Sequence, residues 1–115
     1  MFVYCELNEG LTRGSIVSEV SNNIWGLAPN ASALVGVVSR DAVQDAETQK
    51  WSAPVVFAGD CQALAGETIP NGGGFFSVAN GRVTLSTDPN LGVIAPNIAG
   101  APDRVKDSFV MIHLR

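Results

Sequence analysis

Few side chains in this sequence could do chemistry, and they lie far apart along the chain. The single histidine, His113, belongs to a terminal run of mostly apolar residues. A lone histidine seldom builds a metal or catalytic site without other ligands, so we interpret it as a residue on the outer face or rim of a strand. The two cysteines, Cys5 and Cys61, lack the short spacing of a zinc or thiol-exchange motif. We expect two separate, half-buried thiols.

The glycine triplet and the acidic residues also lack a catalytic pattern. The triplet Gly72-Gly73-Gly74 is not followed by Lys-Ser or Lys-Thr, so it does not match a phosphate-binding loop, and we expect it to let the chain turn sharply. The acidic residues do not have the alternating order of a calcium-binding loop. We interpret five carboxylates as residues of solvated loops: Asp60, Glu67, Asp41, Asp45 and Glu47. The sequence predicts no catalytic residue, no metal ligand and no cofactor.

Composition narrows the class of protein further. The chain has 115 residues, of which 46% are hydrophobic and 16% charged, which predicts one folded domain over 1–115 rather than a disordered chain. The seven basic residues are spread thinly and the formal net charge is -4, so we expect no nucleic-acid partner. The longest uncharged stretch, 20–39, carries Ser, Asn, Gly and Pro throughout, so we expect no membrane insertion.

Short apolar runs recur between Gly, Asn, Pro and Asp residues, a pattern that is typical of strands. The polar segment 40–50 interrupts this pattern. It could form a short helix or a long hairpin excursion, and we favour a surface loop with at most one helical turn. The sequence predicts an all-β, Gly-rich barrel or sandwich of about eight strands. The expected strands lie within 2–5, 15–20, 24–27, 33–39, 53–58, 75–78, 82–85, 91–94 and 108–114.

Two pairs of residues predict hairpins. Asn80-Gly81 stands between two strand-like runs, and this dipeptide favours the type I′ turn, in which both central residues have a positive φ. Asn22-Asn23 stands in the same position between two earlier runs, and asparagine also tolerates a positive φ. The positions that we expect to form structural turns are Gly14, Asn22, Asn23, Gly72, Gly73, Gly74, Asn80 and Gly81.

The two expected hairpins lie in a weak internal repeat. A shift of 58 residues brings Gly14 onto Gly72, and turn residues and apolar residues then match in one register. The two halves of this repeat are 10–39 and 66–95. We expect two meanders that bury their apolar faces against each other, because such packing also covers the edges of the strands.

Four residues are candidates for contacts with other copies of the chain or with a lattice. In the terminal run, Phe109 and Met111 lie on one apolar face and the intervening residues on another, whereas a strand on a solvated surface would show a polar face. We expect this strand to be central in a closed barrel or covered by a neighbouring subunit. Trp25 lies within an expected strand, where a core or subunit contact is common. Trp51 follows the polar segment and is the better candidate for an exposed contact.

The order of these motifs resembles small virion proteins of tailed bacteriophages, above all the head-decoration (cement) proteins. It is also similar to β-domains of phage tail fibres and spikes. A strand enters a Gly-marked turn, a short hairpin follows, a Gly-Val-Val or Gly-Val-Ile strand comes next, and a hydrophobic strand ends the chain. The segments that carry the resemblance are 9–17, 33–38, 55–60, 65–72, 80–83, 91–94 and 108–114.

This resemblance implies a non-enzymatic virion structural protein, assembled in the cytoplasm of a bacterial host. As a decoration protein it would form a homotrimer, bind the lattice of the major capsid protein and stabilise the head. As a tail-fibre or spike domain it would bind a host-surface glycan through Trp51 or Tyr4, contact other tail components, or serve as a trimerisation module. A third possibility is an enzyme, such as an autoproteolytic fibre domain, but the sequence shows no pair of nucleophile and base.

Overall fold

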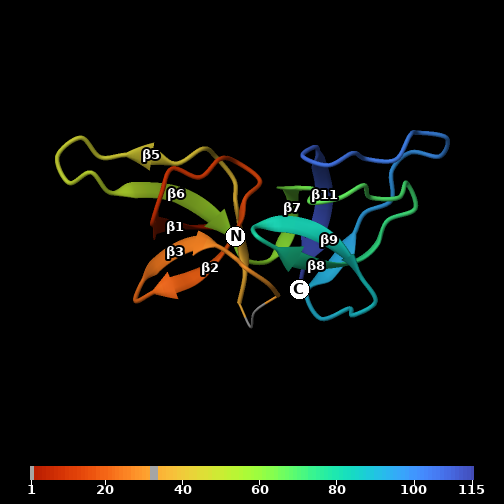
Figure 1. The fold of residues 1–115 in the computed structure, drawn as a ribbon, viewed down its shortest axis with the longest axis horizontal. Helices are drawn as coiled ribbons and strands as arrows, with labels where there is room; N and C mark the ends of the chain where they lie inside the picture. Colours follow the sequence, from red (N-terminus) through yellow and green to blue (C-terminus); the bar gives the residue numbers. More distant parts are fainter. Residues whose placement is uncertain (1, 32–33) are drawn as a thin grey trace.

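The protein folds into short strands. The computed structural model describes residues 2–31 and 34–115, and these contain eleven strands in two sheets and no helix. The strands form two groups that lie side by side along the longest dimension of the molecule, which measures 50 × 25 × 23 Å (Figure 1). We call residues 2–57 the first lobe and residues 58–115 the second lobe. The expected all-β fold is confirmed, and the chain builds a small barrel-like unit twice.

The first lobe contains six strands, namely β1 (Phe2–Leu7), β2 (Ile16–Ser21), β3 (Ile24–Leu27), β4 (Gly36–Val38), β5 (Val43–Gln44) and β6 (Trp51–Val56). Five of them form a ring, because the order β1-β3-β2-β4-β6 returns to β1 through a β1–β6 pairing. Neighbours in the ring are antiparallel except β1 and β3, which are parallel. Strand β5 pairs with the start of β6 outside the ring.

The second lobe repeats this ring with β7 (Gly59–Leu64), β8 (Gly74–Ala79), β9 (Arg82–Ser86), β10 (Gly92–Ile94) and β11 (Phe109–Leu114). Its order is β7-β11-β10-β8-β9, which corresponds strand by strand to β1-β6-β4-β2-β3. A parallel bridge between Ala65 and Val83 joins the two ends of this sheet, as the parallel β1–β3 pairing does in the first lobe.

Matching residues make the same bonds in the two lobes. In the first lobe Leu7 pairs with Trp25, and the N–H of the following residue donates to the Trp25 carbonyl at 2.9 Å. In the second lobe Ala65 pairs with Val83, and the N–H of the following residue donates to the Val83 carbonyl at 2.8 Å. Both pairs obey the same shift of 58 residues (7 to 65 and 25 to 83). The internal repeat is therefore a repeat of structure as well as of sequence.

The repeat extends beyond the expected halves 10–39 and 66–95, which cover only the middle three strands of each lobe. The first strands β1 and β7 and the last strands β6 and β11 also correspond, because each last strand pairs antiparallel with its first strand and with its fourth. In both lobes the excursion that precedes the last strand protrudes at the outer end of the molecule. It lies between β4 and β6 at the upper left of Figure 1, and between β10 and β11 at the upper right.

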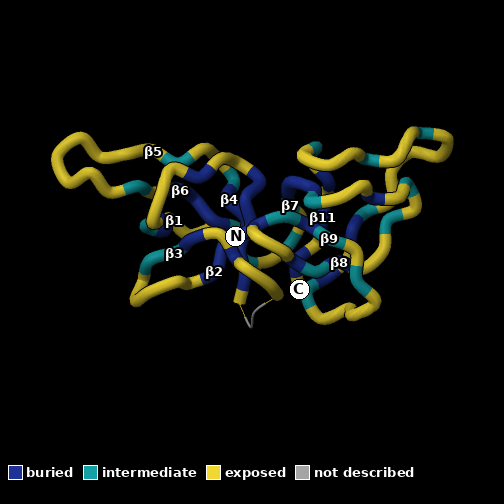
Figure 2. The backbone as a smooth tube through the Cα atoms, in the orientation of Figure 1, coloured by how far each residue is buried: buried dark blue, intermediate teal, exposed yellow. Residues whose placement is uncertain are grey.

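Each ring encloses buried apolar side chains, and one of the two cores continues across the junction. Figure 2 shows buried stretches of backbone in both lobes and where the lobes meet. The first ring encloses Cys5, Leu7, Leu11, Val17, Val38, Ala53 and Val55. The other core contains most buried residues of the second lobe together with Ile16, Ala28, Val35 and Val37 of the first lobe. Strand β4 and the first half of β2 are therefore buried on both faces, one toward their own ring and one toward the second lobe.

Two strands fall outside the expected runs, so eleven strands replace the predicted number of about eight. Strand β5 has only two residues. Strand β7 carries polar Asp60 and Gln62 on its outward positions and small Cys61 and Ala63 on its inward ones. From the sequence alone we interpreted this segment as a loop. Pairing with β11 makes this segment a strand. The loop prediction for Asp60 was therefore wrong.

The expected hairpins form, with different turns. Asn80 and Gly81 have φ angles of 48° and 76°, as a type I′ turn requires. In the other hairpin Asn23 has a positive φ of 61° while Asn22 does not, and a bulge lies between Glu19 and Ser21. The Asn23 N–H donates to the Glu19 carboxylate at 2.8 Å, which stabilises this turn.

The expected glycine turns are also present. Gly14 has a φ of 91°, and Gly73 and Gly74 have φ angles of 77° and 147°, whereas Gly72 does not require a positive φ. A Cβ atom on Gly73 would lie 2.4 Å from the Ile94 carbonyl oxygen, so a larger residue would clash with the backbone there. The triplet therefore turns the chain before β8, as predicted.

The polar segment 40–50 forms a hairpin excursion with an exposed tip. Its strand β5 pairs with β6, and the Gln49 N–H donates to the Asp45 carbonyl at 2.9 Å, which closes a single turn of helical type. The Asp45 carboxylate accepts from the N–H groups of Glu47 and Thr48 at 2.7 and 3.1 Å. These bonds lower the pKa of the Asp45 carboxyl group. Of the expected strand at 33–39, residues 36–38 form β4, and residue 33 lies outside the described residues.

Candidate functional site

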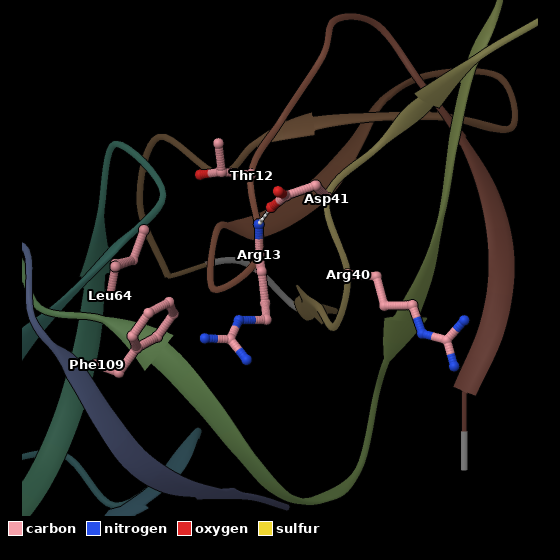
Figure 3. Close-up of a pocket in the computed structure, with 6 residues that line it drawn as sticks. All are labelled: Thr12, Arg13, Arg40, Asp41, Leu64 and Phe109. Carbon is pink, nitrogen blue, oxygen red and sulfur yellow. Dashed lines mark hydrogen bonds between the residues drawn. The ribbon is translucent and has the colours of Figure 1, made fainter.

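The junction between the lobes carries an open depression of about 600 Å³. It is lined by Thr12, Arg13, Arg40, Asp41, Leu64 and Phe109 (Figure 3). Four of these residues come from the first lobe and two from the second, so the depression exists only because the lobes are packed together.

Arg13 is the central side chain of this junction depression. Its guanidinium lies 4.4 Å from the centre of the Phe109 ring, within the range of a cation–π contact. Its backbone N–H donates to the Asp41 carboxylate at 2.8 Å, which holds the hairpin excursion against the loop before β2. Figure 3 shows Arg13 extending toward Phe109, whereas Arg40 extends to the opposite side.

Arg13 gives the depression a capacity for anions, whereas the Arg40 guanidinium extends away from Arg13. Among the described residues, neither the Arg13 nor the Arg40 guanidinium forms an ion pair or a hydrogen bond with a side chain or carbonyl. A guanidinium presents several N–H donors in a plane and binds carboxylates and phosphates well. The Arg13 guanidinium can therefore contact an anionic group, beside the Thr12 hydroxyl and the Asp41 carboxylate, which line the same depression.

A second feature is the outward face of the second lobe. Phe75 pairs with Val93 and Val93 pairs with His113, so these residues form one row across β8, β10 and β11. Phe75, Val93 and the nearby Met111 are 39%, 38% and 40% exposed. This lobe therefore presents apolar side chains to the surroundings on its central strands.

His113 ends this row in a hydrogen bond. Its Nδ1 atom lies 2.8 Å from the Asp60 Oδ1 atom, and both side chains are largely exposed. Asp60 can orient the imidazole ring, as a carboxylate does in many catalytic sites. In the part of the chain that the structure describes, no hydroxyl or thiol is hydrogen-bonded to this ring, and no group of three metal-ligating side chains is present. His113 lies on an outer face, as predicted.

The four predicted contact residues are not brought together. Trp25 packs edge-on against Phe57, with ring centres 5.0 Å apart, and both belong to the surroundings of the first core. Trp51 is half-buried beside the same core and its ring covers Gly10. Both tryptophans therefore help to fill the first lobe. Phe109 and Met111 lie on the outward face of β11, while Val110, Ile112 and Leu114 are buried.

The terminal strand is central in its sheet, between β7 and β10, which was one of the two expected arrangements. Part of its outward face is covered within the chain, because Phe109 contacts Arg13 and lies against Gly14. The rest of this face, at Met111, is open.

A third feature is a shallower depression of about 310 Å³ on the first lobe. Tyr4 and Trp51, the two aromatic residues considered for a glycan contact, both line it. Tyr4 is 65% exposed, and a Glu6–Lys50 ion pair with an N–O distance of 3.8 Å lies beside the two rings. An aromatic side chain next to charged and polar groups can contact a sugar through both its faces and its polar neighbours.

The two cysteines are unpaired, as expected. Cys5 is buried in the first lobe, and Cys61 is half-buried on β7. Burial raises the pKa of both thiols, and the neighbouring Asp60 adds to the effect at Cys61, whose pKa rises from 9.0 to about 11. Neither thiol is therefore activated as a nucleophile at neutral pH.

The sequence did not single out Phe75 and Val93 as exposed residues. The shift of 58 residues aligns Phe75 with Val17 and so did not reveal this. The strand pairings instead make Ile16 and Val37 the equivalents of Phe75 and Val93, and these two are buried against the second lobe. No further lobe follows β11 in the described residues, so the equivalent face of the second lobe is not covered by one there.

Comparisons with known proteins do not assign this chain to a family. No family model, no curated protein and no solved structure matches this chain. The described residues also contain no helix long and apolar enough to cross a membrane.

Proposed function

We propose that this protein is a non-enzymatic structural protein of a bacteriophage virion. In this proposal it forms a homotrimer that binds the lattice of the major capsid protein and stabilises the head. The observation that carries the proposal is the outward face of the second lobe, where Phe75, Val93 and Met111 are exposed on the central strands of a sheet.

This face favours an assembly role for a physical reason. Antiparallel sheets commonly place polar side chains on the face that meets water, and a contiguous apolar patch on a surface marks a contact with another molecule. Here Phe75 and Val93 are paired neighbours on β8 and β10, and Met111 lies two residues from His113, the partner of Val93 on β11. Burying Val93 and Phe75 against a partner would remove apolar area from water and favour association.

The junction depression supports the same proposal through charge. Arg13 and Arg40 are available to acidic groups of a partner, and charged groups at the rim of an interface help to select the partner and its orientation. An apolar face together with a cationic depression is a suitable combination for binding a lattice of repeated acidic and apolar sites.

Binding to phage heads tests the proposal. We expect the purified protein to co-sediment with empty heads of the phage that encodes it, and Met111→Lys to weaken this binding because it places a charge on the apolar face. The β-sheet circular dichroism of the variant should stay as in the wild type, since Met111 is not a core residue. Ile98→Lys, at an exposed residue of the excursion between β10 and β11, is the matched control and should bind as the wild type does. Absence of binding to heads and tails would overturn the proposal.

The second candidate function, a tail-fibre or spike domain that binds a glycan, is favoured by the depression with Tyr4 and Trp51. A glycan array should then show binding that Tyr4→Ala removes and that Tyr4→Phe retains, because phenylalanine keeps the ring. If the wild-type protein binds no glycan on the array, this candidate fails and head binding remains to be judged by co-sedimentation.

A further inference from the structure

We propose that copies of this chain associate head to tail, with strand β1 of one copy seated on the outward face of the second lobe of the next copy. The contact repeats, between molecules, the contact that already joins the two lobes within one molecule. This inference rests on the proposed function, which includes self-association. It adds which two surfaces meet and that they are different surfaces, so that the copies are arranged head to tail.

The first step is the contact within the chain. Ile16, Val37 and Val56 form one row across β2, β4 and β6, on the face that points away from the first ring. Ile16 is 0% and Val37 1% exposed, because the second lobe covers them. The apolar side chains of this row therefore suit a buried contact between the two lobes.

The second step is what covers that row. Val37 and Val56 line a small hollow together with residues 60–62 of β7. At the other end of the row, the Ile16 N–H donates to the Gly81 carbonyl at 3.0 Å, and Gly81 lies in the turn between β8 and β9. The cover thus consists of the first strand and the hairpin turn of the following lobe.

The third step is the equivalent row in the second lobe. By the matching pairings, Phe75, Val93 and His113 occupy the places of Ile16, Val37 and Val56. Two of the three remain apolar, and they are 39% and 38% exposed, since no third lobe follows in the described residues. The face that is buried in the first lobe is therefore open in the second.

The fourth step concerns the residues of the first lobe that correspond to the covering strand and turn of the second lobe. Residues 60–62 of β7 correspond to Phe2, Val3 and Tyr4 of β1, and the turn at Asn80-Gly81 corresponds to Asn22-Asn23. Phe2, Val3 and Tyr4 are 58%, 51% and 65% exposed. They are more apolar than the Asp-Cys-Gln segment that makes the contact within the chain.

Each molecule therefore has an open apolar face at one end of its repeat and an open apolar first strand at the other. The occupant that fits the face is a second copy of this chain, because its β1 strand has the position in the repeat that covers such a face and a matching apolar character. A contact between two different surfaces of identical chains is heterologous, and it continues into a ring or a fibre. Three copies closed in a ring would give the homotrimer of the proposed function.

Mixing two blocked variants tests this polarity. Val93→Glu blocks the face, and Tyr4→Glu blocks the first strand; both residues are exposed, so both variants should keep the circular dichroism of the folded protein. In sedimentation velocity, at a concentration at which the wild type associates, each variant alone should lose association and run as a monomer. An equimolar mixture should form a dimer of one copy of each, because one intact face and one intact first strand remain. Ile98→Glu is the control and should associate as the wild type does.

Other outcomes decide against the inference. A wild type that stays monomeric at high concentration overturns it, and so does a mixture that stays monomeric although the wild type associates. A variant that still dimerises on its own also overturns it, since this would mean that like surfaces pair with like. If either variant fails to fold, Phe75→Glu and Phe2→Glu replace the pair, with the same expected results. Head binding is measured separately: a monomer that binds heads overturns the inference and the homotrimer but keeps the head-binding function. An associating protein that binds no heads keeps the inference and overturns the head-binding function.

Discussion

The two lobes have the same ring of strands but differ in what covers their outward faces. In the first lobe, Ile16 and Val37 are buried, whereas their equivalents Phe75 and Val93 in the second lobe are 39% and 38% exposed. All four of these residues are apolar, so at these two positions the difference comes from position in the repeat, although His113 replaces Val56 farther along the same row. The first lobe is followed by another lobe, and the second is not followed by one in the described residues.

The comparison shows that the same apolar face of a repeat unit can be buried inside the molecule in one unit and exposed for contact with another molecule in the next. Repeat proteins depend on this, because each unit is stabilised by its own core and by the interface with its neighbour. In this chain the interface inside the molecule is complete, and the equivalent surfaces at the ends are available to other molecules.

The largest expected effect separates the covered face from the open one. Val37→Asp should destabilise the fold by more than about 3 kcal/mol, because it buries an unpaired charge at the junction. Val93→Asp, at the equivalent position, should cost no more than about 1 kcal/mol, because the carboxylate reaches water. Urea unfolding followed by tryptophan fluorescence measures both. Should Val37→Asp fail to fold, Val37→Ala and Val93→Ala give a milder comparison, with about 1.5–3 kcal/mol expected for the buried valine. Equal costs at the two positions would contradict the comparison.

The next effect concerns the turn that covers the first lobe. Gly81 has a φ of 76°, and a Cβ atom there would lie 2.3 Å from the Leu27 side chain and 3.2 Å from the Ile16 carbonyl oxygen. Gly81→Ala should therefore cost about 2–3 kcal/mol, through strain and loss of packing at the junction. Gly100→Ala is the control, since Gly100 has a φ of 85° and open space around it. We expect about 1 kcal/mol for this strain alone, and a similar cost at both glycines would mean that the turn does not pack tightly on the first lobe.

A smaller effect depends on pH and reports on β7. The Cys61 thiol keeps its proton in the folded protein up to a pKa of about 11, whereas the unfolded chain loses it near 9.0, mainly because burial disfavours the thiolate. The contribution of this thiol is complete below pH 9 and is lost as the pH rises toward 11. The wild type should therefore lose more stability between pH 9 and 11 than Cys61→Ala does. Identical pH profiles would show that Cys61 is not shielded from water.

The smallest effect is expected at the exposed pair of the second lobe. His113 and Asp60 lie 2.8 Å apart, but their side chains are 56% and 78% exposed. A double-mutant cycle with His113→Gln and Asp60→Asn should give a coupling free energy of about 0.2–1 kcal/mol, as for other surface pairs. A coupling well above this range would mean that the pair is structurally important, against our reading of it as part of an open face.

The sequence predicted much of this fold because its local signals were strong. Asn80-Gly81 specified a type I′ turn by chemistry that needs no tertiary context, and the alternation in 108–114 correctly separated buried Val110 and Ile112 from outward Met111. The shift of 58 residues correctly related the hairpin turns and strands β3 and β9. The bulge in β2 changes the shift to 59 at its start, so Val17 corresponds to Phe76 and Ile16 to Phe75.

The remainder depended on contacts that a local pattern does not contain. Strand β7 has alternating polar residues and small inward ones, and it becomes a strand only by pairing with β11. The exposure of Val93 could not be read from its own neighbours, because Val37 has a nearly identical setting and is buried. The contact between Arg13 and Phe109 joins residues that are far apart in the sequence and depends on the packing of the two lobes.

The mass of the wild-type protein in solution tests the central claim, that the open face and the open first strand bring copies together. Sedimentation equilibrium should give a weight-average mass that rises with concentration above the 12.0 kDa of the single chain. A mass of 12.0 kDa at every concentration, up to the highest that can be reached, would contradict the account.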